Sequence, residues 1–426
     1  MKQRISRAAA LAAAAALILT ACSSGGPGST GPESTDEAAG DVTLWMYPVI
    51  KDEAASKEFW AGVEKDFATA NPDVNLSIEL QPFAKRDEQL SAALAANSGP
   101  DLALVTPDMA ATYLNVGGVL PIDDAIPEDE WDAFLPNSLG AGKFDDELYG
   151  LPIFQNVASN VVNTKVFTDA GLEIPETWDD VLEAAPVLAE KGIAVMDYAG
   201  TTEQTLNLSF YPFLWQAGGT VFTEDGDDIA FDSKEGVKAL TFLVDLIEQG
   251  GLPADAATAS VTIDGSPWSA GKVGIHTNAL PGEVAPLRAA VGGEGVEVAP
   301  PFASKEQVTF GNPGLIALTS INKKENRDAA YAVLEYLASK DFQTELSVAT
   351  GNFSPRTDVP APAEGADYET FQKALDVANP GEPSPAARQV MAALAPYLQA
   401  ALRGELSPQD ALDKAATEAR GILDRN

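Results

Sequence analysis

GPDLALVTPD, residues 99–108, is the stretch that decides how the first part of this chain folds. Gly99-Pro100 turns the chain into the short apolar segment Leu102–Val105, which is followed by Asp108 in a predicted loop. A short apolar run between turn residues is typical of a buried strand. The segments on either side of it should therefore supply the rest of a sheet.

Upstream of this strand, the sequence alternates between strand and helix patterns. Val42–Tyr47 is rich in β-forming residues, Val74–Leu80 places an apolar residue at every second position, and Arg86–Asn97 has the pattern of a helix. Between the two strands, one face of a predicted helix carries Phe59, Trp60, Val63 and Phe67. Strands that alternate with helices imply parallel β-α-β units, and ligands bind beyond the carboxyl ends of such strands.

The same alternation continues downstream. Helix Trp178–Lys191 begins at Thr177, a good N-cap residue, and acidic residues occupy its first turn. Further strands are predicted at Asn160–Val162, Lys272–His276 and Gly314–Thr319, and further helices at Gly236–Gln249, Asn326–Ser339, Ala387–Arg403 and Pro408–Leu423. The fold class is therefore α/β.

The N-terminus has the layout of a secretory signal peptide. Basic residues precede an apolar run, Ala8–Leu19, that is too short to span a bilayer. Leu19-Thr20-Ala21-Cys22 resembles the bacterial lipobox, which implies that residues 1–21 are removed and that Cys22 is lipidated. The chain would then be tethered to the extracytoplasmic face of the cell membrane. The alternative is an ordinary secreted protein with a chance cysteine.

Composition limits the possible partners. Cys22 is the only cysteine in 426 residues, so there is no intramolecular disulfide framework. Removal of residues 1–21 takes away three basic residues and no acidic one, which moves the formal charge from −36 to −39. Such a surface repels nucleic acid and anionic lipid head groups. Solubility explains this charge, and the charge alone does not indicate a cationic ligand.

A spacer separates the leader from the folded part. Residues 22–41 are rich in Gly, Ser, Pro and acidic residues and contain no large apolar side chain. Such a segment cannot bury enough surface to offset its ordering entropy, so we expect a flexible linker. About 385 residues remain, more than one hydrophobic core usually serves, and two lobes are expected.

The order of short motifs resembles a known family. The chain is similar, from residue 42 to its end, to extracellular solute-binding proteins of the maltose-binding type, the receptor components of bacterial ABC importers. The motifs are GPDLALVTPD (99–108), GGVLPIDD (117–124), YGLPIFQNVASNVVNTKVF (149–167), PETWDDVLEAA (175–185), WQAGGTVF (215–222), ALTFLVDLIEQG (239–250), SAGKVGIHTNA (269–279), FGNPGLIALTS (310–320) and GNFSPRTD (351–358).

The resemblance implies a two-lobed periplasmic-binding-protein-like fold of type II, with a ligand cleft between two sheets flanked by helices. Lobe I would hold residues 42–154 and 311–358, and lobe II residues 155–310 and 359–426. It implies a monomeric receptor without catalysis, cofactor or metal. Its partners would be a small carbohydrate, the transmembrane subunits of an ABC permease with a separate ATPase, and the membrane through the lipid anchor.

Sugar recognition needs aromatic rings against the apolar faces of the pyranose and planar polar groups that bind its hydroxyls. The resemblance places residues of both kinds at the cleft. The predicted ligand-binding residues are Trp45, Tyr47, Asp108, Asn156, Trp215, Trp268, Asn278, Asn312 and Arg356.

Each of these residues also has a structural interpretation. A tryptophan commonly lies in the core, Asp108 is a good cap for a following helix, and asparagines often occupy turns. The chain also departs from the maltose receptor: HTNAL (276–280) and SPAARQV (384–390) carry no aromatic residue where that receptor has them. Maltodextrin is therefore disfavoured, and a different oligosaccharide or a monosaccharide derivative is expected.

Other functions remain as alternatives. A secreted glycoside hydrolase needs two carboxylates at a set separation, and no pattern singles out a pair among the 63 acidic residues. His276, the single histidine, disfavours a serine-triad or zinc enzyme, and no Walker A motif is present. A receptor of the same fold for a polyamine, a peptide, a phosphodiester or a metal ion is the nearest alternative, although no segment offers a clear metal site.

Overall fold

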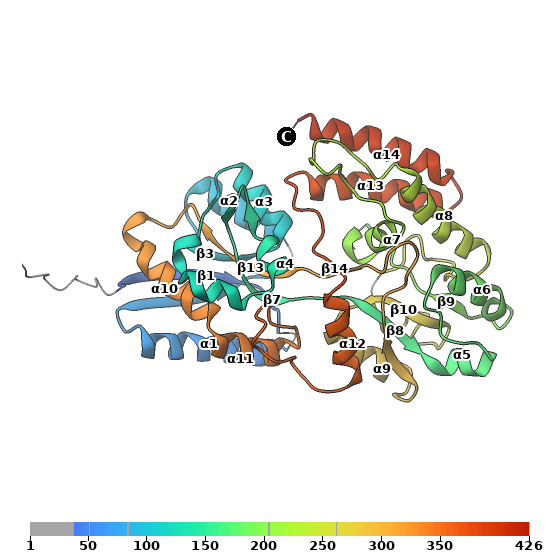
Figure 1. Cartoon of the computed structure of the whole chain (residues 1–426), viewed down its shortest axis with the longest axis horizontal. Helices are drawn as coiled ribbons and strands as arrows, with labels where there is room; N and C mark the ends of the chain where they lie inside the picture. Colours follow the sequence, from blue (N-terminus) through green and yellow to red (C-terminus); the bar gives the residue numbers. More distant parts are fainter. Residues whose placement is uncertain (1–37, 51, 83–84, 203–204, 261, 426) are drawn as a thin grey trace, which may run out of the picture. The chain divides into compact units, whose positions relative to one another are not determined.

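The computed structural model describes residues 38–425 except for positions 51, 83–84, 203–204 and 261. Residues 38–426 form one compact unit (Figure 1). The predicted signal peptide, the lipidation site Cys22 and most of the predicted linker lie outside the described residues. Within the described part of the chain, no helix is both long and apolar enough to cross a membrane.

The predicted linker extends too far toward the first strand. Strand β1 begins at Gly40, which pairs with Val74, and its backbone N–H donates to the carbonyl of Asp73 at 3.1 Å. Gly40 has a φ of +144°, and a Cβ on it would lie 2.0 Å from Oδ1 of Asn326. Glycine and aspartate are uncommon in strands, so composition concealed this start.

A six-stranded sheet forms the first lobe, which we call lobe I. Its strand order is β2-β1-β3-β13-β4, and β7 also pairs with β13. β1 is parallel to β2 and β3, whereas β13 runs antiparallel to β3. The strands are β1 Gly40–Met46, β2 Val74–Leu80, β3 Leu102–Val105, β4 Val119–Leu120, β7 Leu151–Gln155 and β13 Pro313–Thr319.

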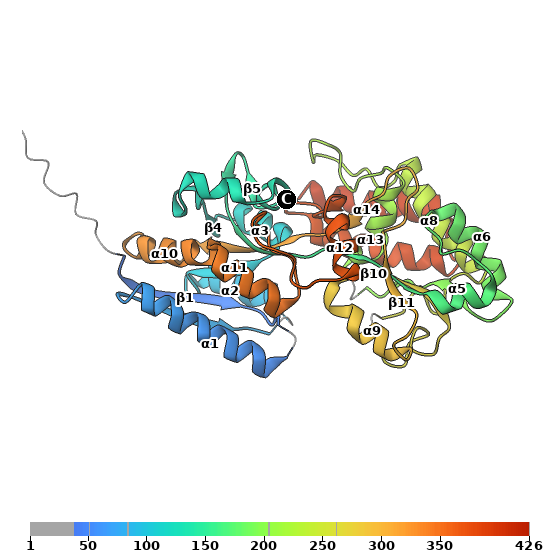
Figure 2. The same cartoon turned by 60° about the horizontal axis from the view of Figure 1, so that its bottom comes forward.

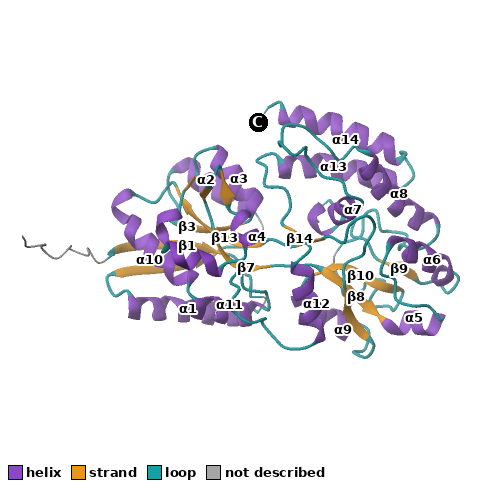
Figure 3. Ribbon diagram, in the orientation of Figure 1, coloured by secondary structure: helices purple, strands orange, loops and turns teal. Residues whose placement is uncertain are grey.

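Helices cover both faces of this sheet (Figure 3). Leu102 and Leu104 point to a core shared with one set of helices, and Ala103 and Val105 point to the opposite core. α1 buries the predicted face through Trp60 and its neighbours. The first core includes α1 Glu53–Ala70, α10 Arg327–Ala338 and α11 Lys340–Thr350, and the second includes α2 Arg86–Ala96 and α3 Pro107–Asn115.

A four-stranded sheet, in the order β11-β8-β10-β9, forms the second lobe, lobe II. Two of its strands, β10 and β11, are labelled in Figure 2. Thr177 caps α6 in a capping box with Asp180, as the sequence predicted for the N-cap. The strands are β8 Ser159–Asn163, β9 Ala194–Met196, β10 Val273–Ala279 and β11 Val296–Ala299. The helices are α5 Thr164–Ala170, α6 Trp178–Ala189, α7 Phe210–Gln216, α8 Lys234–Glu248, α9 Val284–Ala290, α12 Ala366–Leu375, α13 Ala387–Leu402 and α14 Pro408–Leu423.

Extended segments that lie side by side connect the two sheets. The backbone N–H of Asn156, just after β7, donates to the carbonyl of Asn312 at 3.0 Å, and Ala158 donates to Phe310 at 2.8 Å. The remaining short elements are β12 Thr309–Phe310, which pairs with β14 Ala378–Asn379, the hairpin β5 Lys143–Phe144 and β6 Glu147–Leu148, and α4 Pro136–Gly140. The two-lobed α/β fold that the sequence predicted is confirmed.

Two predicted local placements are wrong. Asp108 lies in the first turn of α3 and not in a loop, because Pro107 starts the helix directly after β3. Asn278 lies inside β10 and not after it, because the strand continues to Ala279 through an irregularity at which Asn278 has a φ of +54°. Asparagine tolerates this left-handed conformation better than most residues do, so the strand need not end there.

Candidate functional site

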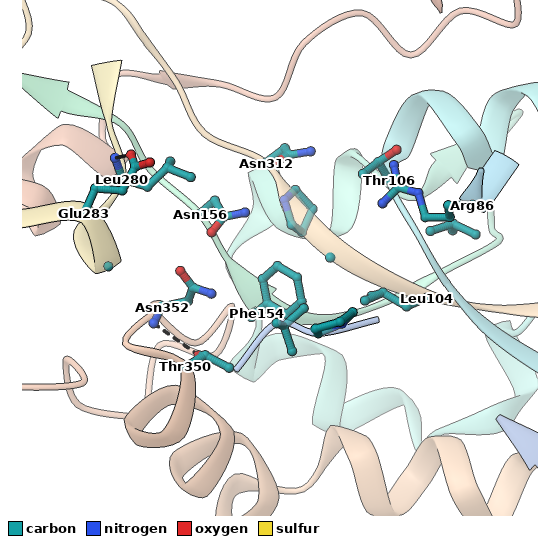
Figure 4. A pocket seen from close by; sticks show the side chains of 16 residues that line it. Arg86, Leu104, Thr106, Phe154, Asn156, Leu280, Glu283, Asn312, Thr350 and Asn352 are labelled. Atoms are coloured by element: carbon teal, nitrogen blue, oxygen red, sulfur yellow. Dashed lines mark hydrogen bonds between the residues drawn. The ribbon is translucent and has the colours of Figure 1, made fainter. Parts of the chain in front are cut away.

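A cavity of about 310 Å³ lies where the connecting segments leave lobe I (Figure 4). We call it the amide pocket, because Asn156, Asn312 and Asn352 line it. Its volume is within the range of small-molecule sites. The lining comes from both lobes and comprises Pro48, Val49, Arg86, Leu104, Val105, Thr106, Phe154, Asn156, Leu280, Gly282, Glu283, Asn312, Pro313, Gly314, Thr350 and Asn352.

The backbone fixes the asparagines and leaves their side chains available. Asn156 follows β7 and Asn312 precedes β13, and the hydrogen bond between their backbones holds them side by side. The backbone N–H of Asn352 donates to Oγ1 of Thr350 at 3.2 Å. The three side-chain amides make no hydrogen bond to another described residue, and each offers both donors and an acceptor. Such groups match the hydroxyls of a polyol.

The amide pocket carries opposite charges at its two ends. Figure 4 shows Arg86 of lobe I at one end and Glu283 of lobe II at the other. Oε2 of Glu283 accepts a hydrogen bond from the backbone N–H of Leu280 at 2.8 Å. The Arg86 guanidinium lies 5.5 Å from the centre of the buried Tyr47 ring. Burial raises the pKa of Tyr47 to about 12. The positive charge of Arg86 acts to lower this pKa, but its effect is smaller.

A second cavity, of about 670 Å³, shares Arg86, Thr106 and Asn312 with the amide pocket. It contains an ion cluster that we call the charged wall, made of Asp87, Thr106, Asp108 and Arg388. Arg388 lies on α13 of lobe II, and its Nε donates to Oδ2 of Asp108 at 2.5 Å, its Nη1 to Asp87, and its Nη2 to Oγ1 of Thr106 at 3.3 Å. Although burial acts to lower the pKa of Arg388, Asp108 and Asp87 raise it above its ordinary value.

The structure brings three of the nine predicted ligand-binding residues into this region. Asn156 and Asn312 line the amide pocket, and Asp108 lines the adjoining cavity as part of the charged wall. Asp108 does not cap a helix through its side chain. Its Oδ1 accepts from the hydroxyl of Thr106, and its Oδ2 accepts from Arg388. Contact of these residues with a ligand stays a prediction.

The predicted aromatic residues lie elsewhere. Trp45, on β1, is half-buried, and its indole N–H donates to Glu79 at 2.8 Å. Tyr47 is buried in the lobe I core. Trp215, on α7, is 4% exposed and lies 6.0 Å from the Tyr211 ring. None of these three side chains lines the amide pocket or the adjoining cavity.

Two further predicted residues lie in lobe II. Trp268 is 1% exposed, and its indole N–H donates to the carbonyl of Leu287 at 3.0 Å. Trp268 and Asn278 line a small cavity of about 130 Å³. Glu283 lines both this cavity and the amide pocket. His276 adjoins Trp268. Burial acts to lower the pKa of His276, but its ion pair with Asp197 raises it.

Arg356 is buried in lobe I rather than placed at the amide pocket. It is 6% exposed and pairs with Asp358 at 2.8 Å and with Glu130 at 3.0 Å. It lines a separate cavity of about 480 Å³ that also includes Gln155 and Phe353. Its charge is therefore already neutralised within its own lobe.

Sequence reasoning missed Arg86, Glu283, Asn352 and Arg388. Of these four, Arg388 had the clearest signal in the sequence, because it is a charged residue at the start of an apolar helix. Its segment stood out in the sequence only for the lack of aromatic residues. Among the described residues, no group of three or more His, Cys, Asp or Glu side chains is placed to hold a metal ion. The arrangement can bind a polar, uncharged molecule through amides, with one cation and one anion at its ends.

Comparison with known proteins identifies a family and a similar fold. The family model described as bacterial extracellular solute-binding protein matches residues 51–344, more than half of the chain. A solute-binding protein of an ABC transporter from Thermotoga lettingae, solved with α-D-tagatose, superimposes with a TM-score of 0.73 at 25% identity, covering 90% of this chain and 99% of that one.

Curated relatives cover less of the sequence. An arabinooligosaccharide-binding protein of Halalkalibacterium halodurans is 31% identical over 41% of this chain and 39% of its own length. A maltotriose-binding protein of Pyrococcus abyssi is 23% identical over 71% of this chain and 63% of its own length. The chain thus spans less than two thirds of these two relatives.

Proposed function

The chain belongs to the family of bacterial extracellular solute-binding proteins, and on that premise we propose that it captures an oligosaccharide and delivers it to the permease of an ABC importer. Lobe I would hold residues 42–154 and 311–358, and lobe II residues 155–310 and 359–426. A separate ATPase would energise transport. The protein itself would bind its ligand as a monomer, without changing it and without a cofactor.

The amide pocket is the observation that carries this proposal. Three asparagine amides without hydrogen-bond partners among the described residues line one cavity between the lobes. Asn156 and Asn352 are half-buried, so their amides are open to a ligand, and sugar hydroxyls can both donate to and accept from an amide. The adjoining cavity of about 670 Å³ provides room for further sugar units.

The lining also supports a ligand other than maltodextrin. The aromatic residues of the two cavities are Phe154 and Phe310, and both are largely buried. A maltodextrin stacks on exposed aromatic faces, which this lining does not supply. Recognition would therefore depend mainly on hydrogen bonds, as expected for a more polar or more branched sugar.

Binding without hydrolysis fits the placement of the acids. A glycosidase needs two carboxyl groups about 5–9.5 Å apart on either side of the bond that it cleaves. Glu283 is the one carboxylate among the residues that line the amide pocket. Asp87 and Asp108 line the second cavity, but both are paired with Arg388.

A ligand panel tests the proposal directly. Specific binding stabilises the native state by about 2.7 kcal/mol at a concentration of 100 Kd. We expect a clear rise in Tm with at least one of arabino-oligosaccharides, maltotriose, galacto-oligosaccharides and diacetylchitobiose, and a smaller rise in the Asn156→Ala variant. A response only to spermidine or peptides would reject the sugar ligand. Release of shorter sugars over time would reject binding without catalysis.

The location at the membrane is a second part of the proposal. The lipobox-like segment Leu19–Cys22 supports anchoring of the mature chain through a lipid on Cys22 at the extracytoplasmic face. Cell fractionation of a Cys22→Ala variant tests this anchor. We expect the variant in the medium, or unprocessed with its leader. A processed variant that still fractionates with membranes as the native protein does would refute the anchor.

A further inference from the structure

We propose that Arg388 is a latch that holds the two lobes closed through Asp87 and Asp108. The contact joins parts of the chain that are far apart in sequence, with separations of 280 residues to Asp108 and 301 to Asp87. This role goes beyond the proposed binding function, because it concerns the equilibrium between open and closed forms and not the recognition of a sugar.

The two sides of the latch belong to different cores. Asp87 is on α2 and Asp108 is on α3, and these helices pack against the six-stranded sheet of lobe I. Arg388 is on α13, which packs with α8 and α14 in lobe II. Near the latch, the hydroxyl of Thr112 on α3 also donates to the carbonyl of Pro385 at 3.4 Å. Separation of the lobes along this side would break all of these contacts.

The carboxylates are committed to the latch rather than open to a ligand. Oδ2 of Asp108 accepts from Arg388 and its Oδ1 accepts from Thr106. Oδ2 of Asp87 accepts from Arg388 and its Oδ1 accepts from Arg86 at 3.4 Å. Every carboxylate oxygen therefore already accepts a hydrogen bond. A sugar hydroxyl at Asp108 would have to compete with a charge-assisted bond, which is the stronger kind.

Lobe II contains an ion cluster that is comparable to the charged wall but lies within one lobe. Arg420, on α14, pairs with Asp228 at 2.7 Å and with Asp232 at 2.9 Å, and its side chain is 41% exposed. Arg388 is 38% exposed and likewise binds two aspartates. The two arginines thus have similar exposure and the same kind of partners. They differ because the aspartates bound by Arg388 lie in the other lobe, whereas those bound by Arg420 lie in the same lobe.

If Arg388 is a latch, the fraction of molecules in the closed form should depend on ionic strength. Salt screens exposed charges, since the Debye length falls from about 30 Å at 0.01 M to about 3 Å at 1 M. High salt should therefore open the native protein. A ligand that binds the closed form gains apparent affinity in proportion to the closed fraction, so the latch should raise the affinity for every ligand by the same factor.

Small-angle scattering of the unliganded full chain carrying Cys22→Ala tests the latch. We expect the radius of gyration to rise with salt in this protein. In the Arg388→Ala variant it should already be larger at low salt and should not change with salt. Arg420→Ala, the matched control, should behave like the parent. The charge swap Asp108→Arg with Arg388→Asp should restore part of the compaction. Arg388→Lys should be intermediate, because a single ammonium group replaces the separate nitrogens that bind Asp108 and Asp87.

An identical radius of gyration for the parent and Arg388→Ala at both ionic strengths would overturn the latch. Circular dichroism checks that each variant is folded. If Arg388→Ala does not fold, the salt response of the parent together with Arg388→Lys decides, and the absence of both effects overturns the proposal. The measurement needs no sugar, so failure of the latch and failure of the proposed carbohydrate function are distinguishable.

Discussion

The amide pocket and the charged wall adjoin each other but differ in how their polar groups are satisfied. In the amide pocket, the side chains of Asn156, Asn312 and Asn352 have no partner among the described residues. In the charged wall, Arg388 and both aspartates satisfy one another across the lobes. On the two proposals above, the first region accepts a ligand and the second holds the two lobes together.

If both proposals hold, recognition of the ligand and closure of the lobes depend on different regions. Unpartnered amides can discriminate among sugars, because each hydroxyl that is missing or misplaced leaves an amide unsatisfied. A paired ion cluster contributes to closure in the same way whatever the ligand is. The two regions should therefore respond differently to substitution, and the following predictions test that.

Trp268→Ala should have the largest effect, and the effect should be on stability. Trp268 is 1% exposed and its indole N–H is bonded to Leu287. Loss of a buried aromatic side chain costs about 3–5 kcal/mol of the free energy of unfolding. Urea unfolding measures this, and Trp45→Ala, at a half-buried position, is the milder control. A variant that keeps its stability but loses sugar binding would show that recognition depends on aromatic stacking in lobe II.

Asn312→Ala should weaken binding without unfolding the protein. Removal of the amide leaves a ligand hydroxyl without its partner, at a cost of about 1–3 kcal/mol, or about 5–150-fold in Kd. Isothermal titration with the best sugar of the panel measures this. Asn115→Ala, at the exposed end of α3, is the control. An unchanged Kd for Asn312→Ala would remove the amide pocket as the recognition site.

Glu382, on the lobe II side, is a carboxylate with no cation among the groups that shift its pKa. It therefore contrasts with the carboxylates of the charged wall, which are paired with Arg388. Burial raises the pKa of Glu382 to about 6, against the smaller opposing effects of the Trp215 side chain and the Val221 backbone. The folded protein thus keeps this proton to a higher pH than the unfolded chain, whose carboxyl titrates near 4.5. Stability from this group is full below about pH 4.5 and is lost as the pH rises through 6, by about 2 kcal/mol.

Glu382→Gln should remove this loss, so that the variant gains stability relative to the parent between about pH 4 and pH 7. Urea unfolding at both pH values measures the change, with the exposed Glu405→Gln as control. An identical pH dependence in parent and variant would show that Glu382 is not buried as a neutral acid.

Arg388→Ala should have the smallest effect, and the effect should be uniform. Partly exposed ion pairs contribute about 0.2–1 kcal/mol, so each sugar should lose affinity by about 1.4–5-fold and the ranking of the sugars should be preserved. Titration of the whole panel measures this, with Arg420→Ala as control. Selective loss of some sugars would make Arg388 a ligand contact and would remove the distinction between the two regions.

Local patterns in the sequence predicted much of the fold. Strands Val74–Leu80 and Leu102–Val105 have the predicted bounds, and the helix that starts after Thr177 has the predicted cap. These features depend on residues close together in the chain, through hydrophobic period and capping chemistry. The two-lobed arrangement followed from the order of motifs.

Tertiary structure decided which of the predicted residues share a cavity. The sequence proposed Asn156 and Asn312, but it did not show that their amides share one cavity with Asn352. It suggested Trp268 and Arg356 as ligand contacts, whereas packing buried the first and ion pairs within lobe I neutralised the second. Asp108 was identified without Arg388, which lies 280 residues away. The availability of a polar group depends on its partners in space, and no local pattern in the chain specifies partners at such separations.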